Sequence, residues 1–257
     1  MFAQSREQWT SRCLGVFSIA TILTIWEISG RTGALDPVLL PRPSLILLTF
    51  LDIVFSGRFA SPLAHTLALF AVGYGIACVL GVSLGIAMGT SPTLYGVFEP
   101  LVEILRPIPK PALVPALFLF LGIGNLTMVT VVVLAVLFPV VINTLQGVRS
   151  LDPVLLDTAR TFQLSRRRTI QSVILPATTP LIFAGMRVGL GLGLVLVVLA
   201  EMLAGETGIG FLILDLQRSF QIKEMFAWLL ILVLLGGGLT FLFNKIEAYL
   251  VPWRGRA

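Results

Sequence analysis

The residues of this chain that could do chemistry are ionisable side chains set inside long apolar stretches. Five of them lie within or beside such stretches: Glu103, Arg106, Lys110, Arg187 and Glu201. A charged side chain is costly in a bilayer, so such residues usually face a bundle interior or a water-filled path that conducts ions or solutes. We therefore predict that these five line a translocation pathway. The alternative is that they pair between helices or extend their head groups to the membrane surface.

Catalytic and metal chemistry are poorly supported by the sequence. The only histidine, His65, has no second histidine or cysteine near it in the sequence, so we expect no metal site. An intramembrane hydrolase would also need a nucleophile motif to act with His65, and none is evident. The glycines of residues 205–210, Gly-Glu-Thr-Gly-Ile-Gly, are spaced as in a dinucleotide-binding loop. They follow an apolar stretch rather than a β-strand, which favours a turn. None of the lysines lies in a Gly-x-x-x-x-Gly-Lys-Ser/Thr loop, so ATP hydrolysis is not expected of this chain.

The composition is that of an integral membrane protein. Of the 257 residues, 56% are hydrophobic and 12% are charged, whereas soluble domains carry about 25% charged residues. The mean hydropathy of +0.97 agrees. These values exclude a disordered chain, a coiled coil, a secreted disulfide scaffold and an ordinary water-soluble enzyme. We predict a single transmembrane domain over residues 1–257, with a core at about 60–250.

Six apolar stretches are candidates for membrane-spanning helices, each of which needs about 20 residues. They are 13–26, 63–88, 94–122, 126–145, 181–203 and 225–243. Residues 44–55 would form a helix only about 18 Å long, which favours an interfacial helix on the outer side. If that segment spanned instead, every later loop would change sides. We therefore predict an all-α fold with six spans and one interfacial helix.

Two features distinguish individual spans. Prolines at 107, 109, 111 and 115 make a continuous third helix improbable, so we predict a broken span there. Small residues recur every four positions in the second and fifth spans, where they permit close helix packing. These are Gly81 and Gly85, then Gly185, Gly189 and Gly193. We expect the second of these stripes to make close contacts in a two-fold dimer.

The distribution of cations predicts the topology. Under the six-span arrangement both termini share one side with residues 149–176, and that side has ten lysines and arginines against five on the other. The ten are Arg6, Arg12, Arg149, Arg160, Arg166, Arg167, Arg168, Lys245, Arg254 and Arg256. The positive-inside rule then places both termini and residues 149–176 in the cytoplasm. We interpret the net charge of +5 in this way, and expect no nucleic-acid partner.

Residues 149–176 form the one substantial polar loop, and its sequence predicts two short helices. Asp152-Pro153 is typical of an N-cap followed by proline at the first helical position. Apolar residues then recur at helical spacing at Leu155, Ala159 and Phe162. Residues 163–165 break the helix, and their serine can cap a second one that runs to Pro176. Three arginines begin that second helix, where the helix dipole disfavours cations, so anionic headgroups or a partner must favour them. The alternative is a solvated loop whose charges only set topology.

Part of this loop resembles a known signature. Residues 157–163, Asp-Thr-Ala-Arg-Thr-Phe-Gln, followed by Val173-Ile174-Leu175-Pro176, resemble the EAA signature of ATP-binding-cassette (ABC) importer permeases. That signature reads Glu-Ala-Ala, three residues, Gly, and a hydrophobic-x-Leu-Pro ending. The chain departs from it at Asp157, Thr158 and Gln163. Glutamine is less favourable than glycine if the turn requires a positive φ.

The flanking sequence extends the resemblance to the nitrate, sulfonate and taurine subgroup of these permeases. The matching segments are 105–110, 120–124, 185–191, 200–202 and 208–210, and the resemblance covers roughly residues 37–245. It implies a type I importer permease in the bacterial inner membrane that transports a small anion such as a sulfonate, taurine, nitrate or bicarbonate. The same subgroup also includes importers of neutral or cationic heterocycles.

The resemblance also implies partners. Two permease copies, expected as a homodimer, would form the pore in the lipid bilayer, two cytoplasmic ATPases would bind ATP and Mg, and an extracytoplasmic binding protein would deliver the substrate. This chain would bind no cofactor of its own. Its ATPase-coupling residues would be Leu155, Asp157, Thr158, Ala159, Arg160, Phe162 and Gln163. The alternative function is an ion-coupled secondary transporter, although the internal inverted repeats common in that class are not evident.

Overall fold

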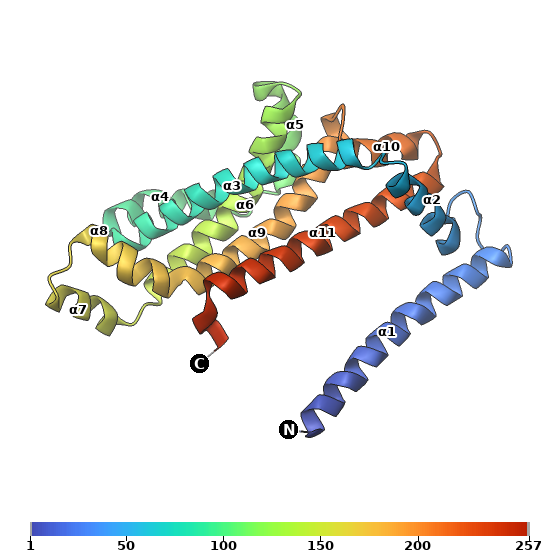
Figure 1. Ribbon diagram of the computed structural model, residues 1–257. Coiled ribbons are helices and arrows are strands. Elements are labelled where there is room, and N and C mark those ends of the chain that lie inside the picture. The colour runs from blue at the N-terminus through green and yellow to red at the C-terminus, as the bar shows by residue number, and fades with distance from the viewer. Residues whose placement is uncertain (1, 256–257) are drawn as a thin grey trace. The chain divides into compact units, whose positions relative to one another are not determined.

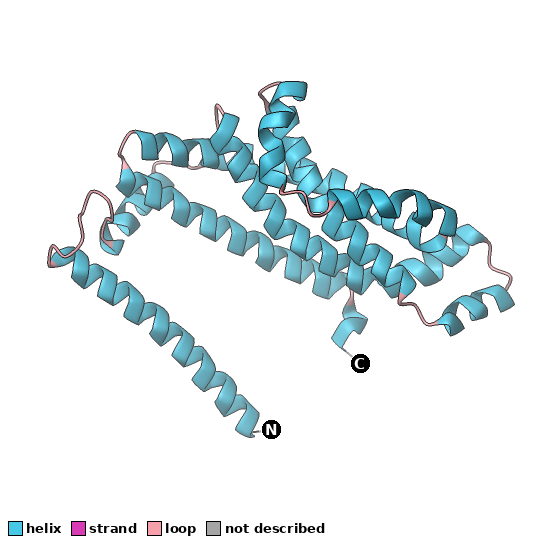
Figure 2. Ribbon diagram, turned by 180° about the vertical axis from the view of Figure 1, so that it is seen from behind, coloured by secondary structure: helices cyan, strands magenta, loops and turns pink. Residues whose placement is uncertain are grey.

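The computed structural model describes residues 2–255; the side chains of residues 2–13, 16 and 254–255 lie outside what it describes. Within the described residues the chain is helical and contains no strand, as Figure 2 shows. The helices are joined by short turns. The all-α prediction is therefore confirmed.

Eleven α-helices follow one another along the described chain (Figure 1). They are α1 (Phe2–Arg31), α2 (Pro43–Phe55), α3 (Ala60–Thr90), α4 (Pro92–Leu105), α5 (Lys110–Leu121), α6 (Asn125–Arg149), α7 (Pro153–Thr161), α8 (Arg166–Thr169), α9 (Leu175–Ala204), α10 (Ile209–Arg218) and α11 (Ile222–Leu250). A π-helical turn, Ile170–Ile174, joins α8 to α9, and a 3-10 turn, Pro252–Gly255, follows α11.

Four helical segments of the described chain are long and apolar enough to cross a membrane. They are α3, α6, α11 and the segment Arg166–Ala204 that includes α8 and α9. Helices α4 and α5 qualify together as a fifth span, bent by 101° at the proline-rich break. The first predicted span falls on α1, part of which lies outside the described side chains. Helix α2, with 13 residues, is too short to span, and its interfacial position remains a prediction.

The predicted end of the loop helix at Pro176 is wrong. The helix that begins at Arg166 continues without a break to Ala204, over 39 residues. Pro176 lies in the first turn of α9, directly after the π-helical turn. Proline removes one backbone donor, and the wider π turn accommodates that loss without ending the helix. The polar connection between α6 and this helix is therefore confined to residues 150–165.

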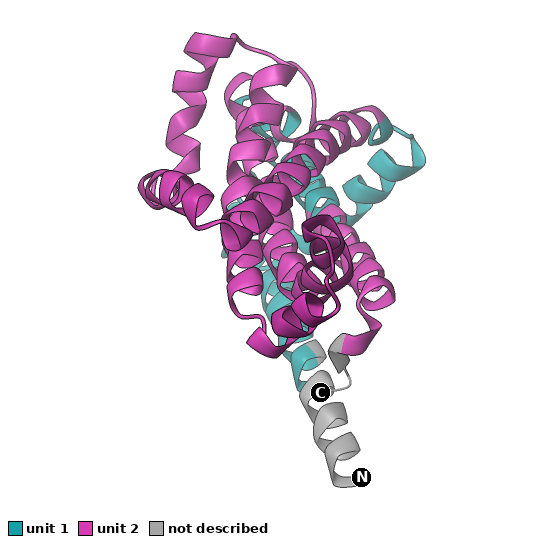
Figure 3. Cartoon of the chain, turned by 90° about the vertical axis from the view of Figure 1, so that its left-hand side faces the viewer, with its two compact units in different colours: residues 1–60, 212–232 teal, residues 61–211, 233–257 magenta. Residues whose placement is uncertain are grey.

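The chain divides into two compact units, coloured separately in Figure 3. One comprises residues 1–60 and 212–232, and the other comprises residues 61–211 and 233–257. The second unit has α6 at its core, where Val132, Val136 and Val140 are fully buried. Helix α6 packs most extensively against α9. The predicted single transmembrane domain remains a prediction.

The glycines of both small-residue stripes lie against α6 of the same chain. A Cβ atom added at any of the five would come within 2.6–2.8 Å of an α6 side chain. The facing residues are Val140 for Gly81, Thr144 for Gly85, Asn143 for Gly185, and Val136 for Gly189 and Gly193. Only a residue without a side chain permits this approach. Because α6 covers the α9 stripe, these glycines make close helix contacts within the chain, and the two-fold dimer remains a prediction.

Candidate functional site

The break between α4 and α5 is held together by the side chain of Lys110. Its Nζ donates hydrogen bonds to the backbone carbonyls of Leu105 at 2.7 Å, Arg106 at 3.2 Å and Ile108 at 2.9 Å. The last carbonyls of a helix lack partners within the helix, and a basic side chain can satisfy them. Because an ammonium group has three donors, these bonds commit the whole group. Lys110 therefore stabilises the bend.

A cavity of about 350 Å³ lies beside this bend and reaches α6 and α9. Its polar side chains are those of Arg106, Lys110 and Asn143. The remaining lining is apolar and comprises Ile108, Ala135, Phe138, Pro139, Ile142, Val188 and Leu192. Ligand sites of small molecules have this size and this combination of apolar walls with a few polar groups.

The polar side chains of this cavity differ in how far they are already paired. The Lys110 Nζ lies 4.5 Å from the centroid of the Phe138 ring, in addition to its three carbonyl bonds. Asn143 donates its Nδ2 to the Pro139 carbonyl at 2.8 Å. Arg106 has a looser partner, Glu103, at 3.8 Å, and both side chains are more than half exposed. Exposed pairs of this kind contribute only about 0–1 kcal/mol, so Arg106 is the most available cation of the cavity.

Two of the predicted pathway residues lie away from this cavity. The Arg187 guanidinium of α9 forms an ion pair with Glu247 of α11. Glu201 is fully buried near the end of α9. Of the five predicted residues, Arg106 and Lys110 thus line the cavity together, and Glu103 flanks it. Arg187 and Glu201 instead contact other helices.

The Glu201 carboxyl group connects α3, α9 and the start of α10. The Thr66 hydroxyl donates to its two oxygens, at 2.8 and 3.0 Å, and the Gly210 backbone N–H donates to it at 2.9 Å. The Ile209 N–H donates to the Thr66 hydroxyl at 3.0 Å. Two free N–H groups of the first α10 turn are thereby satisfied. The Nδ1 of His65 lies 3.6 Å from the Glu201 carboxyl group.

Sequence reasoning missed Thr66 as the partner of Glu201. The only signal was the pair of glycines at 208 and 210, which permit the close approach of the carboxyl group. Gly208 has a φ of +108°, and a Cβ atom there would collide with the Glu201 carboxyl group. Residues 205–208 form the turn that the sequence predicts.

The polar connection after α6 contains α7, whose ends have the predicted chemistry. The Asp152 side chain accepts from the Val154 N–H at 2.9 Å, with Pro153 at the first helical position. Gln163 after α7 has a φ of 52°, in the left-handed region where the signature has glycine. Ser165 then accepts from the Arg168 N–H and begins the next helix.

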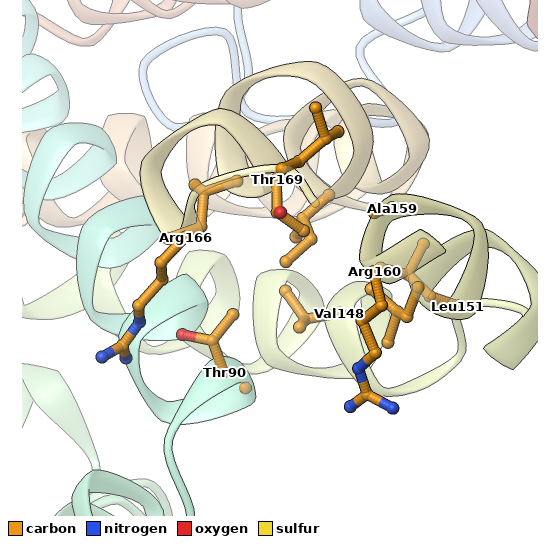
Figure 4. Close-up of a pocket in the computed structure, with 12 residues that line it drawn as sticks. Thr90, Val148, Leu151, Ala159, Arg160, Arg166 and Thr169 are labelled. Atoms are coloured by element: carbon orange, nitrogen blue, oxygen red, sulfur yellow. The ribbon is translucent and has the colours of Figure 1, made fainter. Parts of the chain in front are cut away.

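Helix α7 presents different side chains to its own chain and to the outside. Ala159 is 3% exposed, whereas Leu155 is 43% and Phe162 is 74% exposed. A cavity of about 350 Å³ lies beside α7 and is lined by Ala159 and Val148. Figure 4 shows these two residues, with the Arg160 and Arg166 side chains extending away from them. Arg160 also pairs with Asp157 at 3.1 Å. The two exposed apolar side chains leave a surface that a partner could cover.

Comparison with known proteins is consistent across sequence and structure. Residues 77–256 match the family model described as "Binding-protein-dependent transport system inner membrane component". The chain is 31% identical to a putative aliphatic sulfonates transport permease of Bacillus subtilis, with 93% of this chain and 87% of the relative covered. It is 31% identical to the taurine transport system permease of Escherichia coli, covering 94% and 90%. It is 32% identical to a nitrate import permease of Synechocystis, covering 91% and 88%.

Solved structures agree on the fold. An inward-facing structure of the MetNI methionine ABC transporter matches with a TM-score of 0.64 at 17% identity, covering 74% of this chain and 94% of the other. An amino acid ABC transporter solved with histidines matches with a TM-score of 0.61 at 17% identity, covering 79% and 97%. The fold of about three quarters of the chain is therefore one that solved ABC transporters share.

Proposed function

Since the chain belongs to the family of binding-protein-dependent transport system inner-membrane components, we propose that it carries a small anion across the membrane. Its function is that of a permease subunit of an ABC importer, which the family favours over an ion-coupled secondary transporter. Relatives named for sulfonate, taurine and nitrate transport support an anionic substrate. The observation that carries this proposal is the cavity lined by the available Arg106 side chain. Arg106, Lys110 and the neighbouring Glu103 are the proposed pathway residues.

Helix α7 is the proposed contact with a cytoplasmic ATPase, on which ATP and Mg bind. The Asp152 cap fixes the start of this helix, and the buried Ala159 anchors it to the rest of the chain. Leu155 and Phe162 then supply an exposed apolar surface for the partner. The other proposed coupling residues are Asp157, Thr158, Arg160 and Gln163. A short helix of this kind is marginal alone in water, and partner contacts stabilise it.

The remaining parts of the assembly follow from the family and the cation distribution. We propose two copies of this chain, two ATPases and an extracytoplasmic binding protein, with both termini and α7 on the cytoplasmic side of a bacterial inner membrane. The excess of cations near residues 149–168 supports that orientation. Cysteine labelling in whole cells tests this orientation. A cysteine that replaces Arg218 should react with a membrane-impermeant reagent added outside the cells, and a cysteine that replaces Arg167 should not. Labelling at 167 would overturn the orientation.

Transport is tested in vesicles that contain the permease, its ATPase and its binding protein. Loaded binding protein should stimulate ATP hydrolysis and uptake, and uptake should stop when ATP is omitted. A catalytically inactive ATPase subunit is the matched control. Uptake driven by an ion gradient without ATP would contradict the proposed function.

A further inference from the structure

The cavity beside α7 lies where two membrane-spanning helices end. Gly89 and Thr90 line it from the last turn of α3, and Val148 lines it from the last turn of α6. The 31 residues of α3 extend about 46 Å, which exceeds the hydrocarbon core of a bilayer, about 30 Å thick. The ends of these helices, and the cavity between them, therefore reach the level of the lipid headgroups.

Positive charge begins at this level of the fold. Helix α3 contains no charged residue, and α6 contains none before its last residue. Residues 149–168 then contain five arginines and two aspartates, an excess of three positive charges. The side chain of Asp152 caps α7, and Asp157 pairs with Arg160. Within the part of the chain that the structure describes, no acidic side chain pairs with the arginines at 166, 167 and 168. Such arginines attract anionic lipids.

We propose that the cavity beside α7 binds the phosphate group of an anionic membrane phospholipid, and that Arg166 and Arg160 hold this group. Both arginines line the cavity, and Figure 4 shows their side chains on either side of Thr90. A guanidinium group donates two parallel hydrogen bonds to phosphate oxygens. Arg166 has no ion-pair partner among the described residues, and the pair of Arg160 with Asp157 is exposed and therefore weak. This inference does not depend on which solute is transported.

The apolar part of the lining favours a phospholipid over a free phosphate or a nucleotide. It comprises Val148, Leu151, Leu156, Leu164, Ile170 and Ile174. The glycerol carbons and first methylene groups of a phospholipid gain from burial against these residues, whereas inorganic phosphate would only lose hydration there. None of the described residues that line the cavity is aromatic, so a nucleotide base has no ring on which to stack. The cavity of about 350 Å³ is too small for a whole phospholipid, so the acyl chains remain in the bilayer.

A lipid in this cavity leaves the apolar surface of α7 free for a protein partner. Leu156 and Ala159 face the cavity, whereas Leu155 and Phe162 are exposed on a different face of the helix. The lipid would therefore lie between α7 and the ends of the spans, where it supports the helix from the side of its own chain.

The test measures the binding of phosphatidylglycerol to the delipidated permease complex in detergent by native mass spectrometry. Phosphatidylglycerol should bind about fivefold more tightly than phosphatidylcholine, because the arginines repel the choline cation. Arg166→Gln should weaken the binding of phosphatidylglycerol about fivefold. Arg167→Gln is the matched control, because it removes a neighbouring exposed arginine that does not line the cavity, and it should have less than about half of that effect. Inorganic phosphate and soluble glycerophosphoglycerol should not displace the lipid even at about tenfold excess, because neither gains from the apolar lining.

Equal binding of the two lipids by the unmodified complex would overturn the proposal, and this comparison needs no variant to fold. Equal losses in Arg166→Gln and Arg167→Gln would also overturn it, because they would indicate diffuse attraction to the membrane surface. Displacement of phosphatidylglycerol by inorganic phosphate would make the cavity a site for free anions and refute the lipid assignment. The same spectra report bound ATPase subunits. If Arg166→Gln loses these subunits but keeps the lipid, Arg166 contacts a protein partner and the proposal fails.

Discussion

Replacement of Glu201 by alanine should destabilise the fold strongly, because this carboxyl group is a buried acceptor at the junction of three helices. Glu201→Ala removes the acceptor of the Gly210 N–H and one acceptor of the Thr66 hydroxyl. Thr66 keeps a second acceptor, the Pro62 carbonyl at 3.1 Å, and still accepts from the Ile209 N–H. The Gly210 N–H is thus the group left without its partner.

The magnitude follows from these contacts. A buried N–H without an acceptor costs about 1–3 kcal/mol, and the exchange of the two Glu201 oxygens for the longer Pro62 bond of Thr66 adds up to about 1 kcal/mol. We therefore expect Glu201→Ala to reduce the free energy of unfolding by about 2–4 kcal/mol. Glu201→Gln keeps the shape and one acceptor oxygen, so its cost should be about 1 kcal/mol or less.

The assay is thermal unfolding of the purified permease complex in detergent, followed by the loss of the monodisperse peak in size-exclusion chromatography. Glu206→Ala is the matched control, because Glu206 is an exposed carboxylate in the adjoining turn. The unmodified protein and Glu206→Ala should have the highest midpoint temperatures, Glu201→Gln should be slightly lower, and Glu201→Ala should be the lowest. Equal midpoints for Glu201→Ala and Glu206→Ala would refute the argued role of the buried carboxyl group.

Three further outcomes are expected. Gly189→Leu should lower the yield of folded permease, because the added Cβ atom would collide with α6. Gly191→Leu in the same helix should not lower it, because no atom lies within 4 Å of the Cβ position there. Equal yields of the two variants in size-exclusion chromatography would contradict the contact with α6. Ala159→Trp should reduce both the association of the ATPase and the ATP hydrolysis stimulated by the binding protein severalfold. Arg160→Ala should change both by less than twofold, because exposed ion pairs are weak. If the tryptophan variant still pulls down the ATPase fully and is fully stimulated, α7 is not the coupling element. Gln163→Gly should stabilise the turn after α7 by about 1 kcal/mol, because the φ of 52° at this position is unfavourable for a residue with a side chain. Amide hydrogen exchange measures the effect, and exchange in α7 should become slower. Faster exchange would count against backbone strain at Gln163.

The sequence was most informative where structure depends on neighbouring residues. Asp152-Pro153 predicted the start of α7, and the prolines near 107–111 predicted the break between α4 and α5, because caps and missing backbone donors act within one turn. Four-residue spacing also marked Gly185 and Gly189 as packing positions. Spacing does not identify the partner, however, and α6 of the same chain turned out to face them.

The roles of the ionisable residues could not be predicted in the same way. Lys110 and Glu201 have similar settings in the sequence, each within an apolar region. Only the fold shows that Lys110 bonds to carbonyls a few residues before it, whereas Glu201 bonds to Thr66, 135 residues away. The continuation of the helix past Pro176 was likewise hidden, because a π turn is a property of backbone geometry that no residue pattern in this segment indicates.

The unbroken helix from Arg166 to Ala204 has a mechanical consequence. At 1.5 Å per residue its 39 residues extend about 58 Å, nearly twice the hydrocarbon thickness of a bilayer. One end adjoins α7, and the other holds Glu201 and the turn that leads to α10. A rod of this length acts as a lever arm: a tilt of about 5° around one end displaces the other by about 5 Å. Small rotations at the α7 end are thereby converted into ångström-scale movements at the opposite end of the same helix.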